Sequence, residues 1–448
     1  MRGNVKKICL VLAMFLLISV FSGCGGSTTT TQSSSSSSET TTAQATSTTK
    51  AKENITFTYS FWGTGTEVKS QQSIIAAYQK LNPNVRIKET YTDGGNYPVK
   101  LQTYFASNSA PDVMAMCSDS YTDWEKNGIF YDLSSYIKTN NLQDLYTPEA
   151  IKAFEVNGKQ IGIPYAADTY CIAYNKKLFD QAKIAYPKSD WTETQFIDCA
   201  KSLTTGTGVN KIFGMFFSWY SSEMITDFYG KQAAFDQANN KVFIKGNDTF
   251  KHAVSFLADC INTYKISPDA NDSKNITGGF ETGRYAMAIV ADWDIGSLQK
   301  TIGSKFDWDV VEMPTSEFGN WSVAERVLGL TISSKSSKKD AGCDFIKWFT
   351  SDAESLKLVT SAATPVLTSF IKDEYLSFYP SEWLVHYNKQ VFVNMQSRTR
   401  PHLWMGNWNK AATEINNQMA LYILGKQSLD KSLDNMQANC DNIFAGKK

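Results

Sequence analysis

The chain lacks net charge, has few histidines and contains no apolar run long enough to cross a bilayer. Its 448 residues carry 44 Lys and Arg against 44 Asp and Glu. This balance argues against a nucleic-acid partner, because such proteins usually show a basic footprint. Only three histidines are present, His252, His386 and His402, and none has the HExxH spacing of zinc hydrolases. We therefore expect no metal ion and no cofactor.

Motifs for covalent chemistry are also missing. The sequence has no Gly-x-Ser-x-Gly, no phosphate-binding loop and no Cys-x-x-Cys. Six cysteines beyond residue 52 are widely scattered, and in a large core they are expected to act mostly as small buried hydrophobes. Hydrophobic residues make up 42% and aromatic residues 13% of the chain, so it can fold around a substantial core. Its length predicts more than one domain.

The N-terminus has the pattern of an export signal. Positive residues near the start precede the apolar run Ile8–Phe21, which is too short for a bilayer span of about 20 residues. The run ends in Phe21-Ser22-Gly23-Cys24, which resembles the bacterial lipobox although Phe21 replaces the usual leucine. The resemblance implies a signal peptide over residues 1–23 and lipidation of Cys24. The alternative is an ordinary signal peptide with an incidental cysteine.

A polar segment separates this signal from the rest of the chain. Serine and threonine occupy 18 of the 28 positions in residues 25–52. Such a composition cannot bury enough apolar surface to offset the entropy of ordering. We expect residues 24–52 to form a flexible tether that lifts a globular body off a membrane, and a glycosylated stalk would serve the same purpose.

The remaining residues alternate between strand and helix patterns, which predicts α/β layers with mostly parallel sheets. The expected strands cover residues 54–61, 85–89, 112–117 and 286–291, and the expected helices cover residues 66–81, 97–107, 192–204, 250–264 and 338–350. Thr192 and Gln195 have the spacing of a helix capping box.

Several strings recur in a recognisable order along this body. They include Trp62-Gly63, the runs at 81–85, 110–113, 128–133 and 163–165, then 174–179, Trp191-Thr192, 283–287 and Asp340-Ala341. The set resembles the maltose-binding-like family 1 of extracellular solute-binding proteins, which serve bacterial carbohydrate ABC importers.

The resemblance covers nearly all of residues 55–430 and implies a type II periplasmic-binding-protein fold, with two α/β lobes joined by a hinge. It implies a first lobe from residues 53–166 and 329–376, and a second lobe from residues 167–328 and 377–448. The hinge crossings are expected near residues 166–169, 326–330 and 375–380. Open α/β sheets bind ligands at the strand ends that would face this cleft.

A sugar needs flat apolar platforms for its ring faces and polar groups around its hydroxyls. Trp62 leaves a strand, and Trp293 lies between Asp292 and Asp294 after an apolar strand. The full set of expected ligand-binding residues, chosen from such positions and from the resemblance, is Trp62, Glu67, Tyr97, Asp119, Asp168, Trp219, Asp292, Trp293, Arg326, Trp404 and Trp408. Each could instead be a core aromatic or a turn-capping carboxylate, and Glu67 could simply favour the positive end of its helix.

The sequence thus predicts a monomeric, lipid-anchored binding protein on the outer side of the cell membrane, or in the periplasm if the cell has an outer membrane. It would capture a sugar or oligosaccharide, deliver it to an ABC permease and catalyse no reaction. A surface adhesin for polysaccharide is one alternative. A secreted glycoside hydrolase is another, since two carboxylates beside a sugar are its machinery.

Overall fold

The computed structural model describes residues 53–118, 122–125, 127–217, 229, 234–236, 239, 241–274, 276–401 and 407–446. The residues predicted as the signal peptide and the tether, the lipidation site Cys24, and the predicted ligand-binding residues Asp119, Trp219 and Trp404 lie outside this described part. Among the described residues, no helix combines the length and apolar character that crossing a membrane requires.

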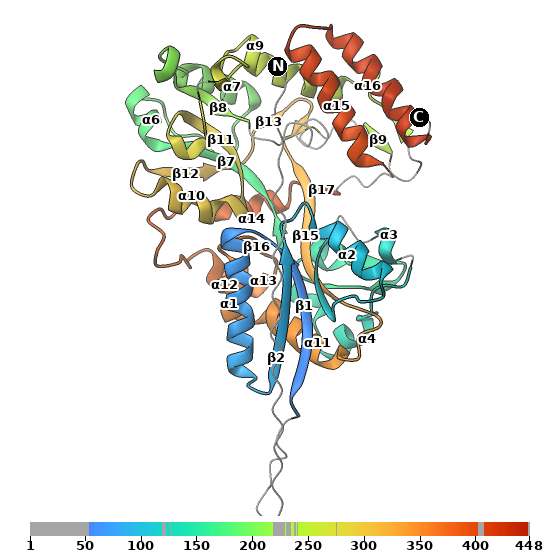
Figure 1. Cartoon of the computed structure of the whole chain (residues 1–448). Coiled ribbons are helices and arrows are strands. Elements are labelled where there is room, and N and C mark those ends of the chain that lie inside the picture. The colour runs from blue at the N-terminus through green and yellow to red at the C-terminus, as the bar shows by residue number, and fades with distance from the viewer. Residues whose placement is uncertain are drawn as a thin grey trace, which may run out of the picture. The chain divides into compact units, whose positions relative to one another are not determined.

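Two separate sheets organise the body (Figure 1). The first has the order β16-β6-β15-β3-β1-β2, with β17 beside β15. Its strands are β1 Ile55–Trp62, β2 Val85–Thr92, β3 Val113–Cys117, β6 Ile163–Asp168, β15 Val323–Ile332, β16 Thr364–Pro365 and β17 Thr399–Pro401. The helices around it include α1 Gly65–Leu81, α2 Tyr97–Ala106, α3 Thr122–Glu125, α11 Lys339–Ser351 and α12 Ala353–Val359.

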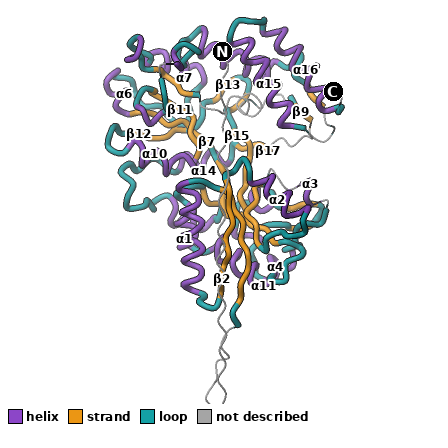
Figure 2. The backbone as a smooth tube through the Cα atoms, viewed as in Figure 1, coloured by secondary structure: helices purple, strands orange, loops and turns teal. Residues whose placement is uncertain are grey.

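The second sheet has the order β12-β7-β11-β8. Its strands are β7 Tyr170–Asn175, β8 Phe213–Phe216, β11 Tyr285–Ala291 and β12 Trp308–Val311. Its helices include α7 Glu193–Leu203, α9 Asp248–Asn262, α10 Ile295–Ile302, α14 Gln390–Gln396, α15 Trp408–Ile423 and α16 Leu429–Phe444. Figure 2 shows helices packed around the strands of both sheets.

Each sheet has its own hydrophobic core, and we call the two bodies the first and second lobe. The core of the first lobe draws on residues from 57 to 167 and from 327 to 375. The core of the second draws on residues from 170 to 321 and from 383 to 444. This arrangement confirms the expected two-lobe α/β fold. It also shows why the chain must cross between lobes more than once.

The first crossing is short because one strand leads directly into another. β6 ends at Asp168 in the first sheet and β7 begins at Tyr170 in the second, with only the fully buried Thr169 between them. β15 pairs antiparallel with both β6 and β3, whereas β1 pairs parallel with β2 and β3. In the second sheet β7 pairs antiparallel with β11 and β12, and β8 pairs parallel with β11. Among the described residues the two sheets are therefore mixed, with five antiparallel and four parallel pairs, rather than mostly parallel as the sequence predicted.

The strand and helix patterns predicted from the sequence are confirmed with small shifts at their ends. The capping box at the start of α7 is present, because the Thr192 amide donates to the Gln195 side chain at 2.7 Å. The Gln195 amide in turn donates to the Thr192 hydroxyl at 3.2 Å. These paired bonds satisfy two donors that a helix start otherwise leaves free.

Candidate functional site

A cavity of about 590 Å³ lies where the ends of several first-lobe strands face the second lobe. This volume is within the usual range of small-molecule sites. Six of the residues predicted from the sequence line it together: Trp62, Glu67, Tyr97, Asp168, Trp293 and Arg326. The structure thus gathers side chains that are up to 264 positions apart in the chain, counted from Trp62 to Arg326.

Trp62 is the last residue of β1, and its half-buried ring forms one wall of the cavity. The ring of Tyr97, at the start of α2, lies 5.5 Å from it between centroids and is tilted by 52°. Tyr97 is itself buried and donates its hydroxyl to the Ser60 carbonyl at 2.8 Å, which fixes its position. Trp62 is therefore held by a ring that cannot easily move.

Trp293 contributes an aromatic wall from the second lobe. It lies in the single turn η5 Asp292–Asp294 directly after β11. Its ring meets Tyr170 edge to face, with centroids 5.2 Å apart and planes at 77°. Tyr170 begins β7, so the platform is supported by the strand that follows the first crossing.

Charged groups surround these aromatic walls. Asp168, at the end of β6, is 9% exposed and lies opposite Arg326 in the pairing of β6 with β15. Glu67 in the first turn of α1 accepts the Thr64 amide at 3.0 Å. Burial raises the pKa of Glu67, and the nearby charge of Asp294 raises it further, while the Thr64 bond opposes them. The site therefore offers carboxylate acceptors and one guanidinium donor.

Asp292 has a different position from the one predicted. It does not line the cavity, and its carboxylate accepts the amides of Thr364 at 2.8 Å and of Trp293 at 3.1 Å. Its own amide donates to the Thr169 carbonyl at 3.1 Å. Asp292 thus links the turn after β11 to β16 and to the first crossing. Burial raises its pKa to about 7, although the bonds from Thr364 oppose this shift.

Trp408 also lies away from the cavity. It begins α15, and its ring packs edge-on against Phe235 with centroids 5.1 Å apart. The structure instead adds Trp124 of α3 to the cavity wall, where it packs against Phe105. Sequence reasoning missed Trp124, which lies in the short helix α3, seven residues after β3 ends at Cys117.

The arrangement suits a ligand that is flat and apolar on its faces and polar at its edge. Aromatic rings cover apolar faces, and carboxylates accept hydrogen bonds from hydroxyl groups. Among the described residues, no group of three or more His, Cys, Asp or Glu has metal-binding geometry.

The chain is similar in sequence to known proteins. The chain is 22% identical over 356 residues to the multiple sugar-binding protein of Streptococcus mutans, covering 75% of this chain and 79% of that protein. It is 22% identical over 316 residues to the maltotriose-binding protein of Pyrococcus abyssi, covering 68% of this chain and 65% of that one.

Solved structures agree on the fold. An ABC substrate-binding protein from Listeria monocytogenes, in complex with cycloalternan, superposes with a TM-score of 0.70 at 23% identity, covering 88% of this chain and 99% of that one. A maltotriose-bound maltodextrin-binding domain from Bdellovibrio bacteriovorus gives a TM-score of 0.67 at 18% identity, covering 87% and 99%. The family model for the bacterial extracellular solute-binding proteins matches residues 62–355, and the chain belongs to that family.

Proposed function

We propose that the protein captures a sugar or oligosaccharide in the cavity between its lobes and delivers it to an ABC permease. The observation that carries this proposal is the pair of tryptophans, Trp62 and Trp293, which line one cavity from different lobes. Asp168, Glu67 and Arg326 supply polar partners beside them. Relatives named for sugar binding support the same ligand class.

The test is thermal unfolding of the purified protein against a panel of mono- and oligosaccharides. A ligand present at 100 times its dissociation constant should stabilise the fold by about 2.7 kcal/mol. The expected result is a clear rise in melting temperature with one class of sugar, accompanied by a change in tryptophan emission. A flat panel, with stabilisation by a peptide or another solute instead, would contradict the carbohydrate assignment.

Two alternatives make different predictions. An adhesin would bind polysaccharide without a change in compactness, whereas capture between lobes should reduce the radius of gyration measured by small-angle scattering. A cavity shared by both lobes favours capture. A glycoside hydrolase would release reducing ends from the bound oligosaccharide, and the proposal excludes any such turnover by the pure protein.

The proposal also includes a lipid anchor at Cys24 after removal of residues 1–23, with residues 24–52 as the tether. The protein would then act as a monomer on the outer face of the cell membrane. Two acyl chains are enough for stable anchoring. Changing Cys24 to alanine should release the protein into the soluble fraction or the medium, and unchanged membrane association would contradict this part of the proposal.

A further inference from the structure

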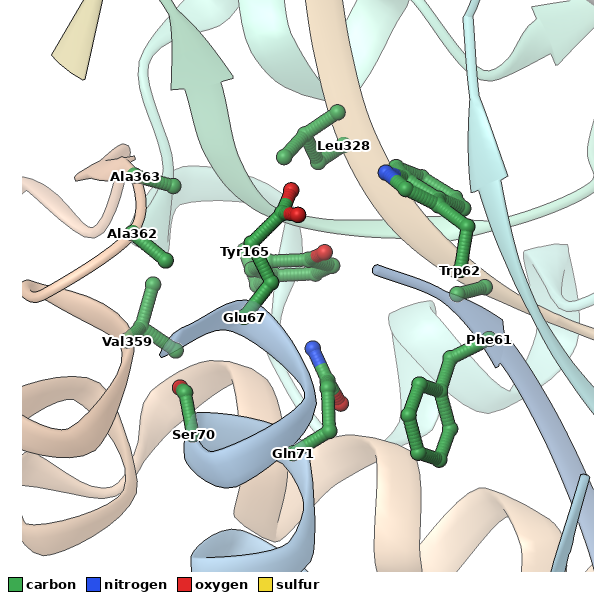
Figure 3. Close-up of a pocket in the computed structure, with 11 residues that line it drawn as sticks. Phe61, Trp62, Glu67, Ser70, Gln71, Tyr165, Leu328, Val359, Ala362 and Ala363 are labelled. Carbon is green, nitrogen blue, oxygen red and sulfur yellow. The ribbon is translucent and has the colours of Figure 1, made fainter. Parts of the chain in front are cut away.

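A second, much smaller cavity lies beside the large one, and we call it the annex. Its volume is about 30 Å³ (Figure 3). Four residues line both cavities: Trp62, Glu67, Leu328 and Ala362. The annex is therefore an extension of the cleft next to Trp62. All of its lining residues belong to the first lobe or to the loop after α12, so it does not depend on how the lobes are arranged.

Two polar side chains of largely buried residues border the annex and form no hydrogen bond with each other. Tyr165 is 4% exposed and Gln71 is 9% exposed. The Gln71 side-chain oxygen accepts the Tyr59 hydroxyl at 2.8 Å, which leaves its amide nitrogen for the annex. Within the described part of the chain, neither the Tyr165 hydroxyl nor the Gln71 amide nitrogen has a hydrogen-bond partner. Neither atom is among the fully buried polar atoms that lack a partner, so both are accessible from the annex and can pair with a ligand atom there.

Glu67 supplies the complementary acceptor. One of its carboxylate oxygens takes the Thr64 amide, and its side chain lies beside Tyr165 and Gln71 around the same space (Figure 3). Two donors and one acceptor match a single hydroxyl group, which can accept two hydrogen bonds and donate one. The remaining wall is apolar and includes Phe61 and Val359, which suits a methylene group.

The size of the annex limits what can enter. A cavity needs roughly 10–15 Å³ to hold one water molecule, so about 30 Å³ admits a group of one or two heavy atoms but no sugar ring. A hydroxymethyl group has one carbon for the apolar wall and one hydroxyl for the three polar groups.

We propose that the annex receives the exocyclic hydroxymethyl group of a hexopyranose ring that stacks on Trp62. This inference rests on the proposed function and makes it more specific. The ligand class is then a hexose or hexose oligosaccharide with a free hydroxymethyl group on the ring at Trp62. Pentopyranose and 6-deoxyhexose rings leave the annex without its partner and bind more weakly.

The experiment compares ligands that differ only in this group. Calorimetry measures dissociation constants for cellotriose with xylotriose, maltotriose with its 6-deoxy counterpart, D-glucose with D-xylose, and D-galactose with D-fucose. The wild-type protein should bind the hexose member of its preferred pair at least about fivefold more tightly, because one hydrogen bond contributes on that order. Equal affinity within the preferred pair would overturn the inference and would indicate that the annex holds only water.

The variant Tyr165→Phe removes the unpartnered hydroxyl alone. Affinity for the hexose should fall about fivefold to tenfold, while affinity for the deoxy or pentose partner stays the same. The control is Tyr146→Phe in the same lobe, where the buried hydroxyl bonds to the Thr350 hydroxyl at 2.7 Å. This control should lower thermal stability and leave the affinity ratio unchanged. Tyr165→Phe should keep its stability, since no described partner is lost.

The two proposals fail in different ways. If sugars bind but the ratio is the same in the wild-type protein and Tyr165→Phe, the annex inference is wrong and the proposed function stands. If no carbohydrate in the pairs or in the wider panel binds, the proposed function fails and the inference fails with it.

Discussion

Replacing Trp62 with alanine tests whether the cleft binds its ligand by stacking. An aromatic side chain buries about 150–250 Å², and covering one ring face removes roughly a third of that area from water. At about 25 cal/mol per Å², the lost contact is about 1–2 kcal/mol. The dissociation constant of the preferred sugar should therefore rise about 5- to 30-fold.

The variant must be separated from a general loss of stability, because Trp62 also packs on Tyr97. Trp348 of α11 offers a matched control: it is half-buried in the same lobe and lies 5.3 Å from the Tyr78 ring at a tilt of 49°. This geometry is close to the 5.5 Å and 52° between Trp62 and Tyr97, but Trp348 does not line the cavity. Trp348→Ala should lower the melting temperature to a similar degree and leave the affinity unchanged.

Isothermal titration calorimetry on both variants and the wild-type protein gives the affinities, and thermal unfolding without ligand gives the stabilities. The reasoning is refuted if Trp62→Ala binds within about twofold of the wild-type protein, which is well below the factor expected from the buried area. It is equally refuted if both variants lose affinity to the same degree, because the loss would then come from destabilisation of the lobe.

Three further changes have defined outcomes. Gly329→Ala should destabilise the first lobe by about 1–3 kcal/mol in chemical unfolding, because an added Cβ would lie 2.5 Å from the Phe154 ring and 2.9 Å from the Ile163 carbonyl oxygen; unchanged stability would contradict the close packing. Gly296→Leu should weaken sugar binding in calorimetry, because a side chain there would lie 2.8 Å from the Ser361 carbonyl oxygen of the first lobe and would oppose approach of the lobes; unaltered affinity would show that this approach is not needed. Burial raises the pKa of Asp292 from 3.8 to about 7, so between these values the folded protein holds a proton that the unfolded chain releases, and stability falls as the pH rises through that window. Asp292→Asn should lack this fall. If the melting temperatures of the two proteins changed with pH in the same way from about pH 4.5 to 7.5, the raised pKa would be contradicted.

The sequence predicts the fold well because its signals are local. Strand and helix periodicities, and the capping pair at Thr192 and Gln195, depend on neighbouring residues and remain valid in the folded protein. Trp62 and Trp293 were predicted for a similar reason, because each follows an apolar strand. In an α/β fold the ends of such strands face the ligand cleft.

Other features depend on contacts that no local pattern records. Asp292 precedes Trp293 directly, yet a single tight turn directs its carboxylate to Thr364 and away from the cavity. The annex depends on Tyr165 and Gln71, which lie on different elements and meet only in the folded lobe. One signal was available: Gln71 is a polar residue one turn before Ile74 and Ile75 on the buried face of α1. A polar residue on an apolar helix face needs a partner.

The third connection between the lobes runs from residue 375 to residue 383. Tyr375 belongs to the first core, and Trp383 belongs to the second. The side-chain nitrogen of Lys389, a residue that is 1% exposed, lies 4.5 Å from the ring centroids of Tyr375 and Tyr379 and 5.6 Å from that of Trp383. It also donates to the carbonyl oxygens of Tyr375 and Phe378.

Burial lowers the pKa of Lys389 to about 7, and its hydrogen bonds to two carbonyl groups, together with the surrounding rings, tie this connection into one compact segment. We expect a fixed segment to hold the lobes together more firmly than a flexible loop would, so that any rotation of the lobes would take place about the remaining crossings. Those crossings pass Asp168 and Arg326, which pair across β6 and β15 and line the cavity. A ligand that contacts these two residues therefore acts directly on the strands about which the lobes would turn. Under the proposed function, binding energy at the site can be coupled to closure without any intermediate pathway.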